Sequence, residues 1–238
     1  MIVKGYAALD FDGAVADTNV ESYLLVDETW HQVAGGGKYP FSSGEFRSLV
    51  RPFITEVGDF FAFTAALMKG EPLQDLDGIR SRYGQIAREG NIAYRRAREV
   101  HKQHFDEWIR MMPLFDGVPQ MFEQLNSMGV PVWIVSSKDE KTIRDILRAN
   151  DMERYIYRVL DESHGRRPSQ FGEMKNLGIE PGLTVVYDDS SENLGTAAAM
   201  GLHAVAAPQG YDLPGRLAPY TKALPTEFPG VVREILNI

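Results

Sequence analysis

The sequence of 238 residues contains no cysteine, which excludes disulfide bonds, thiolate catalysis and cysteine-ligated zinc. Positive charge is also scarce, because 25 Lys and Arg residues stand against 33 Asp and Glu residues, for a net charge of -8. A nucleic-acid backbone attracts surfaces with a surplus of cations. We therefore do not expect nucleic acid as the main partner, although a few local cations could hold a small phosphorylated ligand.

Long apolar runs are absent as well. No segment approaches the length that a membrane-spanning helix requires. Near the N-terminus, Lys4 and Asp10 interrupt the only run that could serve as a signal peptide. We expect a soluble, cytoplasmic protein without a membrane partner, and the sequence leaves its oligomeric state open.

From Pro113 onward, short apolar stretches alternate with helical patterns, as in the βαβ units of a parallel sheet. The stretch "VPVWIVSS" is almost continuously apolar, which is typical of a strand covered on both faces. The expected strands are residues 6–11, 130–137, 155–160, 183–189 and 203–207. The expected helices between them are residues 118–129, 139–151, 168–178 and 191–201.

A helical block from Ala14 to Met112 separates the first strand from the other four. Its segments "ESYLLVDETWHQV" and "EVGDFFAFTAALM" have apolar residues at helical spacing, and "YRRAREVHKQHFDEWIRMM" is expected to be one charged helix that ends before Pro113. The predicted fold class is therefore α/β, with a Rossmann-like, doubly wound parallel sheet core in residues 1–17 and 110–238. The predicted α-helical cap domain, residues 18–109, is inserted after the first strand.

Polar side chains stand at the ends of three of the expected strands, at the edge where parallel sheets bind their ligands. These residues are Asp10 and Asp12 at the end of the first strand, Ser136, Ser137 and Lys138 at the end of the second, and Asp188, Asp189 and Ser190 at the end of the fourth. Asp and Ser also favour turns and helix caps, which would explain any one of these strand ends. Their coincidence at three ends favours a site. Carboxylates that converge on one rim require a cation, and oxygen ligands suit Mg²⁺.

Four segments resemble the motifs of the haloacid dehalogenase superfamily, in the same order and with similar spacing. They are "LDFDGAVADT", "VWIVSSK", "GRRPSQF" and "VVYDDSSENLGTAAAMGL". The resemblance covers residues 6–18 and 113–207, and the helical block is similar only in its position and character to the family's cap. It implies a Mg²⁺-dependent phosphatase that hydrolyses a small phosphorylated metabolite through an aspartyl-phosphate.

The resemblance also implies a role for each matching residue. Asp10 would be the nucleophile, and Asp12 would be the acid and base, with its backbone carbonyl facing the metal. Ser136 and Ser137 would bind the phosphoryl group. Asp189 would bind Mg²⁺, with Asp188 as a second ligand or an outer partner. The presence of Asp12 favours phosphate esters over carbon–halogen bonds, because family members that cleave the latter lack an Asp there.

The sequence departs from the family pattern at three positions. Arg167 stands beside Arg166 where the family has a phosphate-binding Lys, Asn193 stands where many relatives are acidic, and Ala14 replaces the commoner Thr or Val. Either Arg167 binds phosphate, or it is a surface residue and Lys138 or no residue serves instead. The departures at Arg167 and Asn193 leave open a weakly active or non-catalytic member that binds a phosphorylated ligand. A sugar-phosphate phosphomutase is a further alternative, because the same pair of aspartates could return the phosphoryl group to the substrate.

Three further residues in the helical block have two interpretations each. Arg51 lies where caps of this kind place a cation that contacts the substrate, and a structural salt bridge is the alternative. His101 and His104 are spaced to share a metal ion, but without a third ligand we expect a solvated helix face. The substrate itself is not indicated by the sequence.

Overall fold

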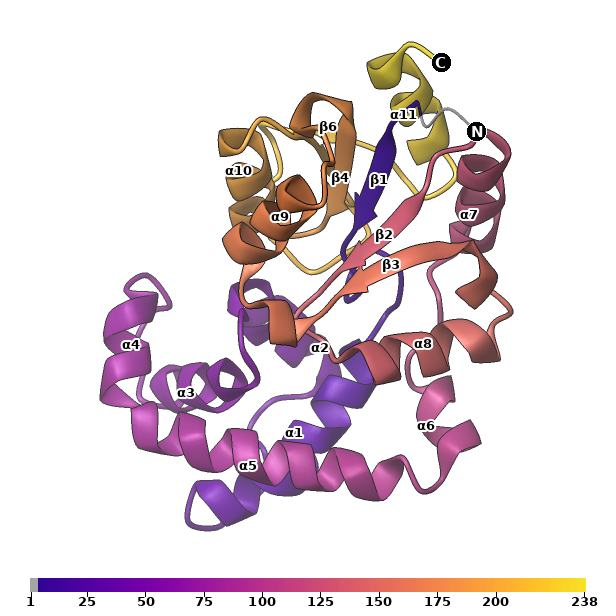
Figure 1. The fold of residues 1–238 in the computed structure, drawn as a ribbon. Coiled ribbons are helices and arrows are strands. Elements are labelled where there is room, and N and C mark those ends of the chain that lie inside the picture. Colours follow the sequence, from indigo (N-terminus) through magenta and orange to yellow (C-terminus); the bar gives the residue numbers. More distant parts are fainter. Residues whose placement is uncertain (1–3) are drawn as a thin grey trace. The chain divides into compact units, whose positions relative to one another are not determined.

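The computed structural model describes residues 4–238, and the chain forms two compact units (Figure 1). Residues 4–17 and 113–238 form the core unit, and residues 18–112 form the helical unit. The strands of the sheet all belong to the core unit, and the helical unit follows the first of them. The predicted fold class, an α/β core with a helical insertion after the first strand, is confirmed. In residues 4–238 no helix is long and apolar enough to cross a bilayer.

The core sheet has six strands in the order β3-β2-β1-β4-β5-β6, and each pair of neighbours is parallel. The strands are β1 (Tyr6–Leu9), β2 (Val132–Val135), β3 (Ile156–Leu160), β4 (Thr184–Asp188), β5 (His203–Ala206) and β6 (Thr221–Lys222). The first five were expected. The sequence did not predict β6, because two exposed polar residues carry no periodic signal.

Helices cover both faces of this sheet, as a doubly wound core requires (Figure 1). They are α7 (Val118–Ser127), α8 (Glu140–Ala149), α9 (Arg167–Asn176), α10 (Ser191–Ala199) and α11 (Phe228–Leu236). Val186 of β4 belongs to an apolar cluster with Phe171 of α9. The next residue, Tyr187, points to the other face and packs on Phe228 of α11, with ring centroids 4.4 Å apart. This burial on both faces explains the uninterrupted apolar strands.

The helical unit has its own apolar core, formed around side chains such as Trp30, Phe61 and Tyr94. Its helices are α1 (Asn19–Val33), α2 (Ser43–Glu45), α3 (Val57–Met68), α4 (Leu76–Arg82), α5 (Gly84–His101) and α6 (Phe105–Arg110). A turn of π-helix (Phe46–Val50) and a short 3₁₀ helix (Arg51–Phe53) follow α2.

The expectation of one charged helix over residues 94–112 is wrong. Helix α5 ends at His101 and α6 begins at Phe105, with a break at His104. The break turns the chain so that Trp108 is buried and its indole N–H donates to Oε1 of Glu21 at 3.3 Å. No proline or glycine marks this break, so the sequence pattern could not show it.

Glu21 of α1 is the centre of a buried polar network in the helical unit. Arg98 donates from Nε to its Oε1 at 2.7 Å and from Nη2 to its Oε2 at 2.9 Å. The hydroxyl of Tyr94 also donates to this carboxylate, at 3.4 Å, and burial raises the pKa of Tyr94 to about 12. These contacts pair the buried charge of Glu21, which would otherwise be costly. They also join α1, α5 and α6.

Candidate functional site

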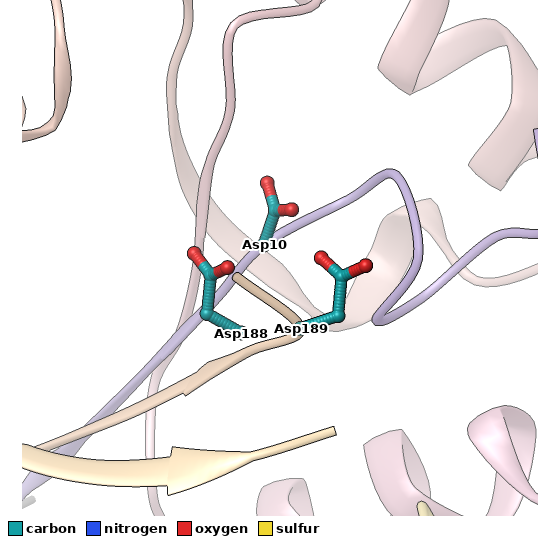
Figure 2. A group of neighbouring side chains, drawn as sticks. All are labelled: Asp10, Asp188 and Asp189. Atoms are coloured by element: carbon teal, nitrogen blue, oxygen red, sulfur yellow. The ribbon is translucent and has the colours of Figure 1, made fainter. Parts of the chain in front are cut away.

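Three buried carboxyl groups meet at the carboxyl end of the core sheet (Figure 2). Asp10 follows β1, and its backbone N–H donates to the carbonyl of Tyr187 at 2.9 Å. Asp188 ends β4, and Asp189 follows it. Carboxylate oxygens of the three aspartates lie within 4.8 Å of one another. The parallel pairing of β1 with β4 brings these strand ends together, although they are far apart in the sequence.

Two carboxyl groups of this cluster, those of Asp10 and Asp188, have raised pKa values. Burial raises the pKa of Asp10 well above its usual range; Arg167 opposes this, while the neighbouring aspartates add to it. Burial likewise raises the pKa of Asp188, against the attraction of Arg167. One guanidinium therefore does not offset the cost of burying these carboxylates.

Arg167 opens α9 and lies in this site, not on the surface. Its Nη2 donates to Oδ1 of Asp10, and its Nε lies 3.4 Å from Oδ2 of Asp188. Its side chain is 10% exposed. Burial alone would lower the pKa of Arg167, but the two carboxylates more than offset that and raise it. The interpretation of Arg167 as a surface residue is therefore excluded, while its role toward phosphate stays a prediction.

Gln170, one turn further along α9, holds Arg167 in place. It lies within the segment "GRRPSQF", but no role was predicted for it. Its Oε1 accepts from Nη1 of Arg167 at 3.0 Å. Its Nε2 donates to the carbonyls of Ser136 at 2.7 Å, Leu160 at 3.2 Å and Asp161 at 2.9 Å. Gln170 thus ties the start of α9 to the ends of β2 and β3. Gln170 and the apolar Met174 are four residues apart, so they share one face of the helix, and both are buried. This spacing was the sequence pattern from which its inward direction could have been predicted.

The end of β2 places a second buried cation beside Asp12. Ser136 is buried, and its Oγ accepts from the backbone N–H of Lys138 at 3.2 Å, whereas Ser137 is exposed. Nζ of Lys138 lies 3.4 Å from Oδ1 of Asp12. The carboxylate of Asp12 does not belong to the three-aspartate cluster. Its predicted metal contact through the backbone carbonyl stays a prediction.

Backbone and amide groups orient the two carboxylates after β4. The side-chain amide of Asn193 donates to both oxygens of Asp188, at 3.2 and 3.1 Å, and the N–H of Ser190 donates to Oδ1 at 2.8 Å. Asn193 therefore serves as a donor to Asp188 where many relatives have an acid. The backbone N–H of Tyr211 donates to Oδ2 of Asp189 at 2.6 Å.

Two glycines make room for Asp189. Gly13 has a φ of +94°, a region that favours glycine, and a Cβ there would overlap the Asp189 carboxylate. A Cβ on Gly210 would overlap the same side chain. Neither Tyr211 nor Gly210 was indicated by the motifs, because the loop after β5 lies outside them.

The remaining predicted residues belong to the helical unit. Nη2 of Arg51 donates to Oγ1 of Thr18 at 2.9 Å, and its guanidinium lies 5.4 Å from the ring centroid of Phe60. Nε2 of His101 lies 2.8 Å from Oε2 of Glu28, and His104 is exposed before α6. Within residues 4–238, the aspartate cluster of the core is the only group of three or more potential metal ligands.

The aspartate cluster fits a hard divalent cation. It offers oxygen donors only, as Mg²⁺ prefers. The raised pKa values of Asp10 and Asp188 show that further positive charge would stabilise their ionised forms. Asp10, Asp188 and Asp189 therefore form a candidate metal site.

A family model described as haloacid dehalogenase-like hydrolase matches residues 6–201. The chain belongs to this family. The match spans β1, the helical insertion and the strands through β4, so it confirms the resemblance that four short motifs indicated.

A curated relative is distant in sequence. A CBBY-like protein of Arabidopsis thaliana is 25% identical over 124 residues, which are 47% of this chain and 39% of that relative. The matched region thus spans less than half of that relative's length.

Solved structures of other proteins share the fold. A provisionally assigned phosphoglycolate phosphatase from Lactobacillus delbrueckii has a TM-score of 0.73 at 16% identity, covering 100% of both chains. A provisionally assigned β-phosphoglucomutase from Thermotoga maritima has a TM-score of 0.60 at 16% identity, covering 97% of this chain and 99% of that one. At such identities the likeness concerns the fold alone.

Proposed function

We propose that this haloacid dehalogenase-like hydrolase is a Mg²⁺-dependent phosphatase that acts on a small phosphorylated metabolite. One observation carries the proposal: the Asp10 carboxylate lies at a strand end between the Arg167 guanidinium and the Asp188 and Asp189 carboxylates. Few structural roles would bring three buried carboxylates together. A carboxylate nucleophile can approach an anionic phosphate only where positive charge compensates both, and Arg167 together with a cation held by these carboxylates would supply it.

In the proposed reaction, an oxygen of Asp10 bonds to phosphorus while the bond from phosphorus to the leaving oxygen breaks. Asp12 donates its proton to that oxygen. Asp12 then takes a proton from a water molecule whose oxygen attacks phosphorus, and the bond from Asp10 to phosphorus breaks. Inorganic phosphate and an alcohol are the products, and both aspartates return to their starting states.

The neighbouring residues serve this chemistry in distinct ways. Asp10, Asp188 and Asp189 would hold Mg²⁺, which supplies positive charge to offset the repulsion between carboxylate and phosphate. The guanidinium of Arg167 can bind two phosphoryl oxygens at once. Ser136 and Ser137 would donate further hydrogen bonds to the phosphoryl group.

We extend the proposal to the helical unit, in which residues 18–109 would act as the substrate-selecting cap and Arg51 as a substrate contact. The alternative is a structural role, with which the hydrogen bond of Arg51 to Thr18 and its contact with the Phe60 ring are compatible. Arg51→Lys and Arg51→Met distinguish the two: a raised KM with unchanged stability supports substrate contact, and lowered stability with unchanged KM contradicts it.

The direct test is phosphate release from a panel of phosphorylated metabolites that includes phosphoglycolate and hexose phosphates. Turnover should require Mg²⁺, stop with EDTA, and be lost in Asp10→Asn. The exposed Asp27→Asn serves as a matched control and should leave turnover unchanged. No release from any ester, or activity that survives Asp10→Asn, contradicts the proposal.

The same panel separates the alternatives. An isomerised sugar phosphate formed without free phosphate would identify a phosphomutase. Ligand binding in calorimetry that needs no Mg²⁺ and leads to no turnover would identify a binding protein. In a structure with Mg²⁺ and beryllium fluoride, the phosphoryl mimic should be bonded to Asp10, and a mimic bound elsewhere contradicts the assignment of the nucleophile.

A further inference from the structure

Two buried cations lie at the carboxyl end of the core sheet, and they have different partners. Arg167 pairs with Asp10 and Asp188, whereas Nζ of Lys138 lies 3.4 Å from Oδ1 of Asp12. The side chain of Lys138 is 3% exposed, and that of Asp12 is 23% exposed. Within residues 4–238, Asp12 is the only acidic residue at ion-pair distance from Lys138. The two aspartates of the first motif thus each have a cation of their own.

Stability alone does not account for the pair between Lys138 and Asp12. Burying an ammonium group is costly unless it is paired, and ordering a lysine side chain loses conformational entropy. Buried ion pairs often contribute no more to the free energy of folding than apolar side chains of similar size would. A buried lysine aimed at the predicted acid and base therefore calls for a chemical reason.

Hydrogen bonds close the backbone turns that carry both partners. The N–H of Lys138 donates to the buried Oγ of Ser136, which fixes the turn after β2. The turn that carries Asp12 is closed by a hydrogen bond from the N–H of Gly13 to the carbonyl of Ala16 at 2.9 Å. The ammonium group lies at ion-pair distance from the buried Oδ1 of Asp12, which accepts no hydrogen bond within residues 4–238, and Oδ2 is the oxygen left for other partners.

We propose that Lys138 is a positioning residue for Asp12: its ammonium group holds Oδ1 so that Oδ2 exchanges the proton with the leaving oxygen and later with water. This rests on the proposed function. The proton that Oδ2 donates as the ester bond breaks returns to Oδ2 from the attacking water, and Lys138 keeps its own protons throughout. A direct phosphate contact by Lys138 is the competing role.

The two roles differ in how they depend on the leaving group. A good leaving group needs little protonation, so loss of a well-placed acid matters most for poor leaving groups. A phosphate ligand acts on every ester alike, and its loss also weakens the binding of inorganic phosphate. The dependence of kcat/KM on the leaving group therefore distinguishes them, because kcat/KM reports the step in which the ester bond breaks.

The experiment compares wild type, Lys138→Met, Lys138→Arg and the control Lys141→Met on alkyl phosphates and on 4-nitrophenyl phosphate. Lys141 is exposed on the following helix, where it pairs with Asp145. We expect Lys138→Met to lower kcat/KM about 100-fold for alkyl esters and at most about 10-fold for 4-nitrophenyl phosphate, with inhibition by inorganic phosphate nearly unchanged. Lys138→Arg should restore much of the loss, and Lys141→Met should match wild type.

A second comparison works through Asp12 itself. If Lys138 acts through Asp12, then adding Lys138→Met to Asp12→Asn should cause no further loss of kcat/KM. The proposal is overturned if the losses of kcat/KM from Lys138→Met and Asp12→Asn multiply in the double variant. It is also overturned if Lys138→Met lowers kcat/KM equally for all esters and weakens phosphate inhibition, or if it causes no loss at all. If Lys138→Met does not fold, the same comparisons are made with Lys138→Gln. A wild-type protein that releases no phosphate from any ester overturns the proposed function and this proposal together, whereas wild-type turnover with a uniform loss overturns this proposal alone.

Discussion

The backbone N–H of Tyr211 donates a hydrogen bond to Oδ2 of Asp189, with 2.6 Å between the two atoms. This contact fixes a candidate metal ligand to the loop that follows β5. The preceding residue, Gly210, lies so close to Asp189 that an added Cβ would overlap it. The orientation of Asp189 therefore depends on a glycine from a loop outside the family's motifs.

Gly210→Ala is expected to weaken divalent-metal binding by displacing the Asp189 carboxylate. Affinity for Mn²⁺, measured by calorimetry or by electron paramagnetic resonance, should fall about 10- to 100-fold, as it does when the orientation of a ligand is lost. Gly172→Ala on α9 is the control, because its Cβ would meet no neighbour within 4 Å. Equal affinities in the two variants would show that the loop does not position Asp189.

Removing the guanidinium of Arg167 is expected to lower catalysis strongly. Arg167→Met should reduce kcat/KM about 10²- to 10³-fold, the loss that follows removal of one preorganised electrostatic contact. Arg167→Lys retains the charge but not the forked geometry, so its activity should lie between wild type and Arg167→Met. Arg166→Met, at the adjacent exposed position, is the control. Full activity in Arg167→Met would show that the residue only stabilises the fold.

The raised pKa of Asp10 predicts a pH-dependent effect on stability in metal-free protein. A carboxyl group whose pKa is higher in the folded state opposes folding once it ionises, so its contribution falls as pH rises from about 4, its unfolded pKa. Asp10→Asn removes this charge and should raise the urea midpoint in EDTA at pH 7. The difference from wild type should shrink as pH falls toward 4.

At saturating Mg²⁺, wild type should instead be more stable than Asp10→Asn. The ion binds the folded wild type more tightly than the variant, and selective binding to the folded state raises stability. Urea unfolding of wild type and of Asp10→Asn, each with EDTA and with Mg²⁺, gives four curves at each pH. A variant that is less stable than wild type at every pH in EDTA would show that the pair between Asp10 and Arg167 outweighs the cost of burial.

The helical unit depends on the ion pair between Glu21 and Arg98. Arg98→Met leaves the Glu21 charge buried without its main partner and should cost about 3–5 kcal/mol in the free energy of unfolding. The double variant Glu21→Gln with Arg98→Met should recover part of that loss, because the uncompensated charge is gone. The exposed Arg96→Met on the same helix should change the free energy by less than about 0.5 kcal/mol. A small effect of Arg98→Met would indicate that water reaches Glu21.

The sequence by itself determined the parallel sheet, the helical insertion and the placement of Asp10, Asp188 and Asp189 at one edge. These features follow from local periodicity and from a general rule: the carboxyl ends of parallel strands lie at the same edge of a sheet. Residues that are distant in the chain could be brought together on this basis without knowledge of any particular contact.

Only the tertiary structure decided which side chains meet there. In the folded chain Arg167 pairs with Asp10, Lys138 pairs with Asp12, and Gly210 packs against Asp189. The tertiary structure also divided the expected helix over residues 94–112, since burial of Trp108 beside Glu21 outweighed the local preference for an unbroken helix. Such contacts depend on side-chain direction and packing between distant segments, which local periodicity does not encode.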